Sequence, residues 1–421
     1  MARRMKDSGI EWIGEIPEGW TKNKVIRLFD TIGSGTTPKN VTSDFPVVNW
    51  IQSGDITGSF MPACKNVISA NLLSQYSALR VYPAPFIIIA MYGASVGNAS
   101  ISLIDGCVNQ ACCVLSSPSC NLHYAFYVIK SAQSYLVRKA VGGGQPNISQ
   151  ETIKQLWLPL PPLSTQDIIV RNLDATCSKI DDLLSSVHAS IEEYKKLKQS
   201  VITQAVTKTI YDDFGNPSKF RKLRSLCDVL SKGTTPKDIE TQNDEFYCIR
   251  YLKSENIVSN QLNLNPTFFI TAETNNSLER SKLNSGDILF VIAGASIGKV
   301  AITTADFLPA NTNQAVAFIR LSSSYQYATR YIWYFLQSDV VKQLIALSAV
   351  QSAQPNLSLE DLGAMRLPLP DQMGCLKITD YLDAKCAEID KLIAKKEQLV
   401  KELESYKKSL IYEVVTGKRE V

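Results

Sequence analysis

Residues Lys179–Lys208 read KIDDLLSSVHASIEEYKKLKQSVITQAVTK and repeat apolar or permissive side chains at alternating spacings of four and three. This is the 3.5-residue period of a coiled-coil seam, and Lys198 takes its one missing place. The pattern returns 209 residues later, with Lys396 as its break. The seam positions are Ile180, Leu184, Val187, Ile191, Tyr194, Val201 and Ala205, then Ile389, Ile393, Val400, Leu403, Leu410 and Val414. Two matching helices in one chain are predicted to pair with each other.

The remaining composition is that of a globular protein. A length of 421 residues fits two or three domains, and 20% charged residues argue against disorder. The longest apolar run, Pro85–Tyr92, is too short to span a membrane. No secretory signal precedes it, and the ten cysteines form no C-x-x-C pair, so we expect reduced thiols and a cytoplasmic location. With two histidines, His-based triads and metal sites are disfavoured, and none is predicted.

The net charge of +4 is weak evidence for a nucleic-acid partner. No segment is a basic block, so any electrostatic footprint is predicted to be local. Lysines and arginines gather near Lys22, Lys24 and Lys39 in the first half, and near Lys222, Arg224 and Lys237 in the second.

Short motifs occur twice in the same order, which indicates an internal duplication. The pairs are GTTPK at 35–39 and 233–237, GAS-x-G at 93–97 and 294–298, NQA at 109–111 and 313–315, QPN at 145–147 and 354–356, and LPLP at 158–161 and 367–370. Two globular domains, residues 1–163 and 210–372, are therefore predicted to alternate with two stalk helices, residues 164–209 and 373–421.

Each globular half is predicted to be α+β, with buried strands near residues 86–91, 112–115, 288–292 and 315–319. Helices are predicted at 124–141 and 327–347, and Ser164 with Asp167 is predicted to cap the first stalk helix. A pseudo-twofold relation between the halves requires the stalk helices to run antiparallel. About 30 residues at 1.5 Å each give a spacer of roughly 45 Å, longer than one turn of B-DNA.

The start DSGIEWIGEIPEGW, the duplicated loops and the helical sequences YKKLKQSVITQAVTK and SYKKSLIYEVVTGK resemble the type I restriction-modification specificity (S) subunits of the HsdS family. The resemblance implies that each half reads one half of a bipartite DNA site. It also implies that the stalk sets the spacing and docks two methyltransferase subunits, while restriction subunits translocate and cleave. S-adenosylmethionine, ATP and Mg²⁺ are then expected on the partner subunits and no cofactor on this chain.

The GTTPK loops offer hydroxyls and a cation, which suits phosphate contact, although a plain turn is the alternative. The Asn-Gln pairs could read adenine but favour a turn role. Base readout is expected where the halves differ, near 41–79 and 238–280. The candidate DNA-binding residues are Thr36, Thr37, Lys39, Asn49, Gln52, Lys22, Lys24, Thr234, Thr235, Lys237, Arg250, Tyr251, Lys222 and Arg224.

The candidate docking residues lie in the stalk seams, since the resemblance assigns the stalk to subunit assembly. They are Ile180, Leu184, Val187, Ile191, Tyr194, Ile389, Ile393, Val400, Leu403 and Leu410. On the solvated side of the first helix, Glu192, Lys195 and Lys196 fit either a plain polar face or a docking surface.

Enzyme motifs fail on inspection, so no catalytic residue is predicted. The segment 294–299 resembles a P-loop but has the wrong glycine spacing, and Val300 replaces the required hydroxyl. Asp371, Asp383 and Lys385 superficially match a nuclease pattern that the first half does not keep. The alternatives are a two-headed scaffold that binds protein or glycan, and a nuclease or methyltransferase in its own right.

Overall fold

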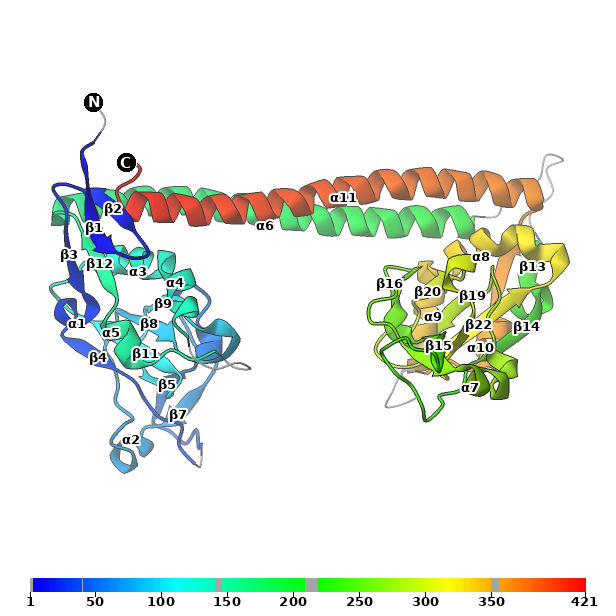
Figure 1. Ribbon diagram of the computed structural model, residues 1–421, viewed down its shortest axis with the longest axis horizontal. Coiled ribbons are helices and arrows are strands. Elements are labelled where there is room, and N and C mark those ends of the chain that lie inside the picture. The colour runs from blue at the N-terminus through cyan, green and yellow to red at the C-terminus, as the bar shows by residue number, and fades with distance from the viewer. Residues whose placement is uncertain (1–2, 40, 141–145, 209–218, 350–355) are drawn as a thin grey trace. The chain divides into compact units, whose positions relative to one another are not determined.

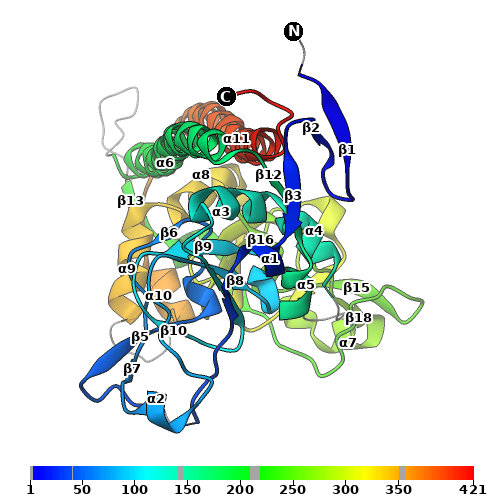
Figure 2. The same ribbon diagram turned by 90° about the vertical axis from the view of Figure 1, so that its left-hand side faces the viewer.

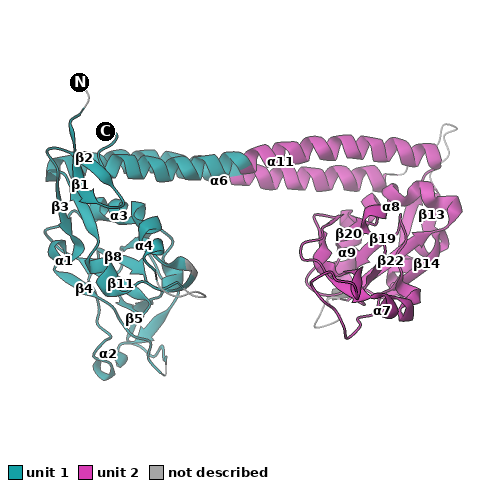
Figure 3. Ribbon diagram, in the orientation of Figure 1, with its two compact units in different colours: residues 1–187, 398–421 teal, residues 188–397 magenta. Residues whose placement is uncertain are grey.

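The computed structural model describes residues 3–39, 41–140, 146–208, 219–349 and 356–421. The chain forms two compact units, and each long helix passes from one into the other (Figure 3). Unit 1 comprises residues 1–187 and 398–421, and unit 2 comprises residues 188–397. Helix α6 spans Leu163–Thr207 and helix α11 spans Gln372–Val415, each starting within one residue of the predicted stalk boundary.

Unit 1 is built around a five-stranded sheet whose central strand β8 is buried along its whole length, because its side chains are apolar on both faces. The sheet order is β4 (Thr31–Gly33), β11 (Cys112–Ser116), β8 (Phe86–Ala90), β9 (Ala99–Ser102) and β6 (Phe60–Met61). A smaller sheet has the order β10 (Cys107–Val108), β5 (Val47–Ile51) and β7 (Val67–Ser69).

Two strand pairs and five short helices complete the globular part of unit 1. The pairs are β1 (Met5–Ile10) with β2 (Gly14–Pro17), and β3 (Thr21–Lys24) with β12 (Trp157–Leu160). The helices are α1 (Val25–Leu28), α2 (Leu72–Gln75), α3 (Leu122–Ser131), α4 (Gln133–Arg138) and α5 (Gln150–Lys154).

Unit 2 repeats this topology, which confirms the predicted α+β duplication. Its main sheet has the order β14 (Cys227–Lys232), β22 (Val316–Leu321), β19 (Ile288–Val291) and β20 (Val300–Ile302). Its small sheet has the order β18 (Phe269–Thr271), β15 (Tyr247–Leu252) and β21 (Ala310–Thr312). The strand pairs are β13 (Lys219–Lys222) with β23 (Arg366–Leu369), and β16 (Ile257–Val258) with β17 (Gln261–Leu262). Its short helices are α7 (Ala272–Ser277), α8 (Thr329–Leu336), α9 (Asp339–Ala349) and α10 (Leu359–Ala364).

The long helices predicted at 124–141 and 327–347 are each broken in two. In unit 1 the break is at Ala132, between α3 and α4, and in unit 2 it is between α8 and α9. There the Asp339 N–H donates to the Thr203 hydroxyl of α6 at 3.0 Å, so a contact distant in sequence replaces a helical bond. The predicted end of the first helix at 141 lies outside the described residues, whereas α9 ends at Ala349, two residues beyond the predicted end of the second.

The predicted cap of α6 is also wrong. Ser164 lies inside the first turn, because the helix begins at Leu163 and the Pro162 carbonyl accepts from Thr165 and Gln166. The Asp167 carboxylate instead accepts from the Asn121 side chain at 2.8 Å, which joins α6 to the start of α3.

The two long helices pair antiparallel within each unit, as predicted. In unit 2, Lys198 of α6 forms an ion pair with Asp390 of α11 at 2.7 Å. In unit 1, Lys407 of α11 forms the same pair with Asp181 of α6 at 2.5 Å. Lys407 lies 209 residues after Lys198, and Asp390 lies 209 residues after Asp181. The lysine in the seam therefore occurs at equivalent positions of both helices and is not an irregular break.

Lys396, the break expected in the second seam, has a different role. Its ammonium lies 5.7 Å from the ring centroid of Tyr194 and forms a cation–π contact across the helix pair. Lys396 is therefore not the counterpart of Lys198; Lys407 is.

The core of each unit contains the start of one long helix and the end of the other. In unit 1 the buried Tyr124 hydroxyl donates to the carbonyls of Pro159 and Val415, at 2.9 and 3.2 Å. In unit 2 the Tyr331 hydroxyl donates to Pro368 and Val206, at 2.6 and 3.1 Å. Burial raises the pKa of both phenols further above neutral pH.

The end of α11 lies against the N-terminal hairpin in unit 1 (Figure 2). A Cβ atom on Gly417 would lie 2.4 Å from Pro17 Cγ, and Gly417 has a φ of +74°, so only glycine fits this close approach. The Lys418 ammonium and the Tyr412 hydroxyl both donate to the Ile13 carbonyl, at 2.8 and 3.2 Å.

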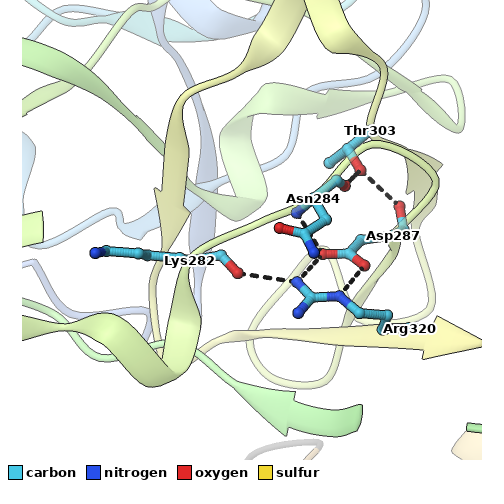
Figure 4. A network of polar contacts seen from close by, with 5 residues as sticks. All are labelled: Lys282, Asn284, Asp287, Thr303 and Arg320. Carbon is cyan, nitrogen blue, oxygen red and sulfur yellow. Dashed lines mark hydrogen bonds and ion pairs between the residues drawn. The ribbon is translucent and has the colours of Figure 1, made fainter. Parts of the chain in front are cut away.

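Unit 2 contains a partly buried ion pair that joins the neighbouring strands β22 and β19 of its main sheet (Figure 4). Arg320 of β22 donates to both carboxylate oxygens of Asp287, at 2.8 and 2.7 Å. The Asp287 side chain is 1% exposed and also accepts from the Asn284 N–H at 2.7 Å. This carboxylate therefore fixes the turn that precedes β19.

Among the described residues, no helix combines the length and apolar character that crossing a bilayer requires.

Replacing Asp287 by alanine is expected to destabilise unit 2 by about 3 kcal/mol, because a partly buried guanidinium and a backbone donor lose their acceptor. Thermal and urea denaturation of the full chain measure the change. The exposed Asp238→Ala is the control and is expected to change stability by less than about 0.5 kcal/mol. Equal stability of both variants would contradict a structural role for this pair.

Candidate nucleic-acid interface

Two of the duplicated motifs meet at one edge of the small sheet in each unit. In unit 1 the GTTPK loop lies against the end of β10, where a Cβ atom on Gly35 would be 1.7 Å from the Val108 carbonyl oxygen. In unit 2 a Cβ atom on Gly233 would be 1.8 Å from the Thr312 oxygen. Both loops therefore need glycine for close backbone approach.

The loops are tied to the Asn-Gln motifs by one hydrogen bond in each unit. The Thr37 hydroxyl donates to Gln110 Oε1 at 2.6 Å, and Thr235 donates to Gln314 in the same way. The Asn109 side chain accepts from the Ala111 N–H at 3.1 Å, which is a turn role. These amides therefore shape the loop, as the sequence favoured.

In each unit a tyrosine hydroxyl donates a hydrogen bond to a backbone carbonyl of the GTTPK loop or the residue before it. Tyr82 donates to the Ser34 carbonyl and Tyr251 to the Thr234 carbonyl, both at 2.9 Å. The Tyr251 side chain is 0% exposed, and burial raises its pKa. The prediction that Tyr251 contacts DNA is therefore wrong for this conformation; we assign it a positioning role.

The groups that the loops leave exposed are hydroxyls and lysines. Thr37, Lys39, Thr234, Thr235 and Lys237 are exposed, and Thr36 is half-buried. Among the residues that the structure describes, neither Lys39 nor Lys237 has an acidic partner. The Thr37 and Thr235 hydroxyl protons are already donated to the glutamines, so the groups left to contact phosphate are the two lysine ammonium groups and the hydroxyls of Thr36 and Thr234.

Asn49 and Arg250, predicted as base readers, occupy equivalent positions and have the same structural contact. The Asn49 amide donates to the Asp105 carbonyl at 2.8 Å, and the Arg250 guanidinium donates to the Asp306 carbonyl at 2.5 Å. Each bond joins the middle strand of the small sheet, β5 or β15, to the turn that precedes its parallel neighbour, β10 or β21. The half-buried Gln52 follows β5, and its N–H donates to the Asp55 carboxylate at 2.9 Å.

The remaining basic candidates lie elsewhere in their units. The ammonium groups of Lys22 and Lys24 lie 5.2 and 5.4 Å from the Trp157 ring centroid, on the β3–β12 pair. Figure 1 shows this pair beside the long helices, with β5 and β7 at the opposite end of unit 1. Lys222 is exposed on β13, and Arg224 donates to the Leu230 carbonyl at 3.4 Å.

The GAS-x-G loops are tight turns, as the sequence favoured. Their glycines all have positive φ, between +76° and +88°. The Gly97 and Gly298 N–H groups each donate at 2.9 Å to the strand that precedes the turn, at Ala90 and Val291. These loops therefore connect the strand pairs β8–β9 and β19–β20.

The predicted docking residues lie in the seam between the two helices rather than on an outer surface. Ile180, Ile191, Ile389, Val400 and Leu410 are 3–9% exposed, and the other five are half-buried. While the helices are paired, the five buried residues are closed to a separate subunit and the five half-buried ones offer it only part of their surface. The helices expose other apolar side chains that the heptad pattern did not single out: Leu163, Ile168, Leu183, Leu197, Met373, Leu376, Tyr381, Leu399 and Tyr406.

The nuclease pattern is not assembled. The Asp383 carboxylate accepts from the Tyr334 hydroxyl at 2.7 Å and pairs with Arg330, while Lys385 pairs with Glu388 at 2.9 Å. The Asp371 carboxylate accepts from the Gly374 N–H at the start of α11. Within the described residues no group of three potential metal ligands occurs.

A family model described as the type I restriction modification DNA specificity domain matches the chain twice, at residues 17–193 and 216–402. The chain belongs to this family. Each match covers one globular half and the adjoining part of one long helix, which agrees with the duplication seen in the fold.

Curated relatives and solved structures agree with this assignment. The chain is 25% identical to the type I restriction enzyme MjaVIII specificity subunit of Methanocaldococcus jannaschii, over 70% of this chain and 69% of that protein. It is also 25% identical to the EcoBI specificity subunit of Escherichia coli, over 78% and 74%. The fold matches a chain from a structural study of assembly and conformational transition in the type I R-M system, with a TM-score of 0.73 at 15% identity, covering 95% and 98%.

The HsdS subunit of Thermoanaerobacter tengcongensis gives a TM-score of 0.51 at 16% identity, covering 96% of this chain and 98% of that one. The family resemblance and the fold class predicted from the motifs are thereby confirmed.

Replacing Gly35 by alanine is expected to displace the GTTPK loop of unit 1, because the new methyl group would overlap the Val108 carbonyl. DNA retention by the assembled complex is expected to fall at least tenfold, while the main sheet stays folded. Gel shift with target duplex and circular dichroism measure the two effects. Gly54→Ala is the matched control, since a Cβ atom there meets nothing within 4 Å. Unchanged retention by Gly35→Ala would contradict a role for this loop.

Proposed function

We propose that this chain is the non-catalytic DNA specificity subunit of a type I restriction-modification complex, and that each unit reads one half of a bipartite DNA site. The observation that carries the proposal is the same hydroxyl- and lysine-bearing loop in each of two units that both match the specificity-domain family. Two readers in one chain suit a site in two parts. The curated relatives are themselves named as specificity subunits.

The partners that fit this role are two methyltransferase subunits and restriction subunits, which would carry S-adenosylmethionine, ATP and Mg²⁺. The exposed apolar residues of the helices support a docking surface there. Leu197 and Tyr406 are 49% and 47% exposed and are related by the 209-residue offset, so each helix offers one equivalent contact. The scaffold alternative has no support from the relatives, because all those cited are restriction-enzyme specificity subunits.

Deleting this gene in its host is expected to abolish adenine methylation at every occurrence of one split motif, since the methyltransferase would lose its reader. Sequencing that detects modified bases measures the change, and a plasmid copy of the gene is expected to restore it. Deleting the partner methyltransferase gene instead is the control and is expected to give the same loss. An unchanged methylation map in a strain with an active methyltransferase would overturn the proposal.

Inserting seven residues after Ser190 and seven after Leu399, its counterpart, is expected to lengthen the spacer between half-sites and leave both half-sites unchanged. Seven helical residues add about 10 Å, close to three base pairs, and keep the period of the seam. Methylome sequencing reads the spacer directly. Inserting into α6 alone is the control and is expected to abolish methylation, because it shifts Lys198 away from Asp390. Altered half-site sequences would contradict the division of labour between units and helices.

A further inference from the structure

Two phenylalanines stand out on the surface. Phe45 is 89% exposed and Phe246 is 74% exposed, the highest values for any large hydrophobic side chain among the described residues. One lies in each unit. Burying such a ring is favourable, so a largely solvated phenylalanine in each unit is a candidate contact for a partner.

The two rings occupy equivalent positions in the duplicated fold. Ile51 of β5 pairs with Val108, directly before the first Asn-Gln motif. Leu252 of β15 pairs with Thr312, directly before the second. Each phenylalanine lies six residues before that paired residue. The equivalence therefore follows from strand register as well as from sequence.

Backbone hydrogen bonds anchor the segment that carries each ring. In unit 1, Thr42 and Pro46 accept from Ser69 and Ala70 at the end of β7, each at 2.7 Å. In unit 2, Glu240 exchanges two hydrogen bonds with Phe269 of β18, at 3.0 and 2.8 Å.

A further contact in unit 2 fixes Phe246 itself. The Asp244 carboxylate accepts from the N–H groups of Phe246 and Tyr247, at 2.8 and 2.6 Å. The exposed rings are thus presented by anchored segments.

The segment that carries each ring begins at the GTTPK loop. Lys39 precedes Phe45 by six residues, and Lys237 precedes Phe246 by nine. The Lys39 N–H bonds the Tyr76 hydroxyl at 3.2 Å, so the lysine and the ring are both anchored to the β7–α2 corner. A cation and a planar apolar ring on one anchored segment match a partner that has phosphates outside and stacked planar bases inside.

Other charges and the place in the fold agree with this partner. Asp44 and Glu245 are exposed carboxylates beside the rings and would repel phosphates, so the ring positions suit contact with bases better than contact with the backbone. Figures 1 and 2 show β5, β7 and α2 at the end of unit 1 away from α6 and α11, so this surface is separate from the helices proposed to dock subunits.

We propose that Phe45 and Phe246 are DNA wedges, which insert between neighbouring bases of the two half-sites and partly unstack them. This inference rests on the proposed DNA-reading function. Apolar wedges of this kind kink a duplex, and the ease of kinking depends on the base step. Each ring therefore adds selection for a flexible step, such as a pyrimidine followed by a purine, without forming a hydrogen bond to a base.

The experiment uses the full chain assembled with its methyltransferase subunits and a duplex that carries the split motif read from the wild-type methylome. 2-Aminopurine replaces adenine at successive positions, because its fluorescence rises when stacking is lost. The wild type is expected to raise fluorescence at one step in each half-site. Phe45→Ala is expected to abolish the rise in one half-site and Phe246→Ala in the other, each weakening binding about tenfold or more.

Phe220→Ala is the matched control, since this phenylalanine is 52% exposed but lies on β13. It is expected to leave both fluorescence signals and the affinity unchanged. Selective binding by the wild type with unaffected Phe45→Ala and Phe246→Ala variants would overturn the wedge alone. Loss of methyltransferase subunits from either variant, with both fluorescence signals kept, would also overturn it and would assign the rings to a protein contact. Absence of sequence-selective binding by the wild type would overturn the proposed function itself.

Discussion

The whole fold depends on an exchange of helix ends. Neither unit can complete its core from its own consecutive residues, because each core includes the last turns of a helix that begins in the other unit. Tyr124 and Tyr331 are examples of this dependence. Each phenol donates to a carbonyl of the extended segment that leads into one helix and to a carbonyl near the end of the other helix. A buried hydroxyl with two acceptors fixes where both helices sit. The Lys198–Asp390 and Lys407–Asp181 pairs then set their register.

The loops that carry the candidate interface are held by the sheets and cores of the two units. Gly35 and Gly233 touch strand backbone, and Tyr82 and Tyr251 support the loops from the core. Residues that are identical or equivalent in the two units mostly make such internal contacts. The side chains left free toward solvent are threonines, lysines and a phenylalanine, which offer phosphate contact and stacking rather than hydrogen-bonded base recognition. Discrimination between two different half-sites must therefore draw on the segments that differ between the units.

Much of the fold could be predicted from the sequence, because it rests on periodicity and repetition. The seam, the buried strands and the duplication are local or self-similar patterns. The broken helices could not be predicted, since Thr203 binds Asp339 across a long sequence separation. Lys407 was missed because the seam was read with lysine as an interruption, although the 209-residue offset places it opposite Asp181. Exposure was the weakest expectation: Tyr251 is buried, and the seam residues face each other rather than a partner.

The contact between the chain ends has a consequence for how such genes can change. Gly417 and Lys418 meet Pro17 and Ile13 in unit 1, whereas in the duplicated element order the corresponding step, from α6 to β13, is continuous in sequence. The order of elements is therefore circular: each globular part is followed by a long helix, and the second helix ends beside the start of the first globular part. A crossover within the first Leu-Pro-Leu-Pro segment could therefore exchange the residues before it for a foreign half while the contacts between α6 and α11 are inherited intact. Such an exchange would combine half-sites anew and would require the foreign half to fit only the helix ends that enter its core.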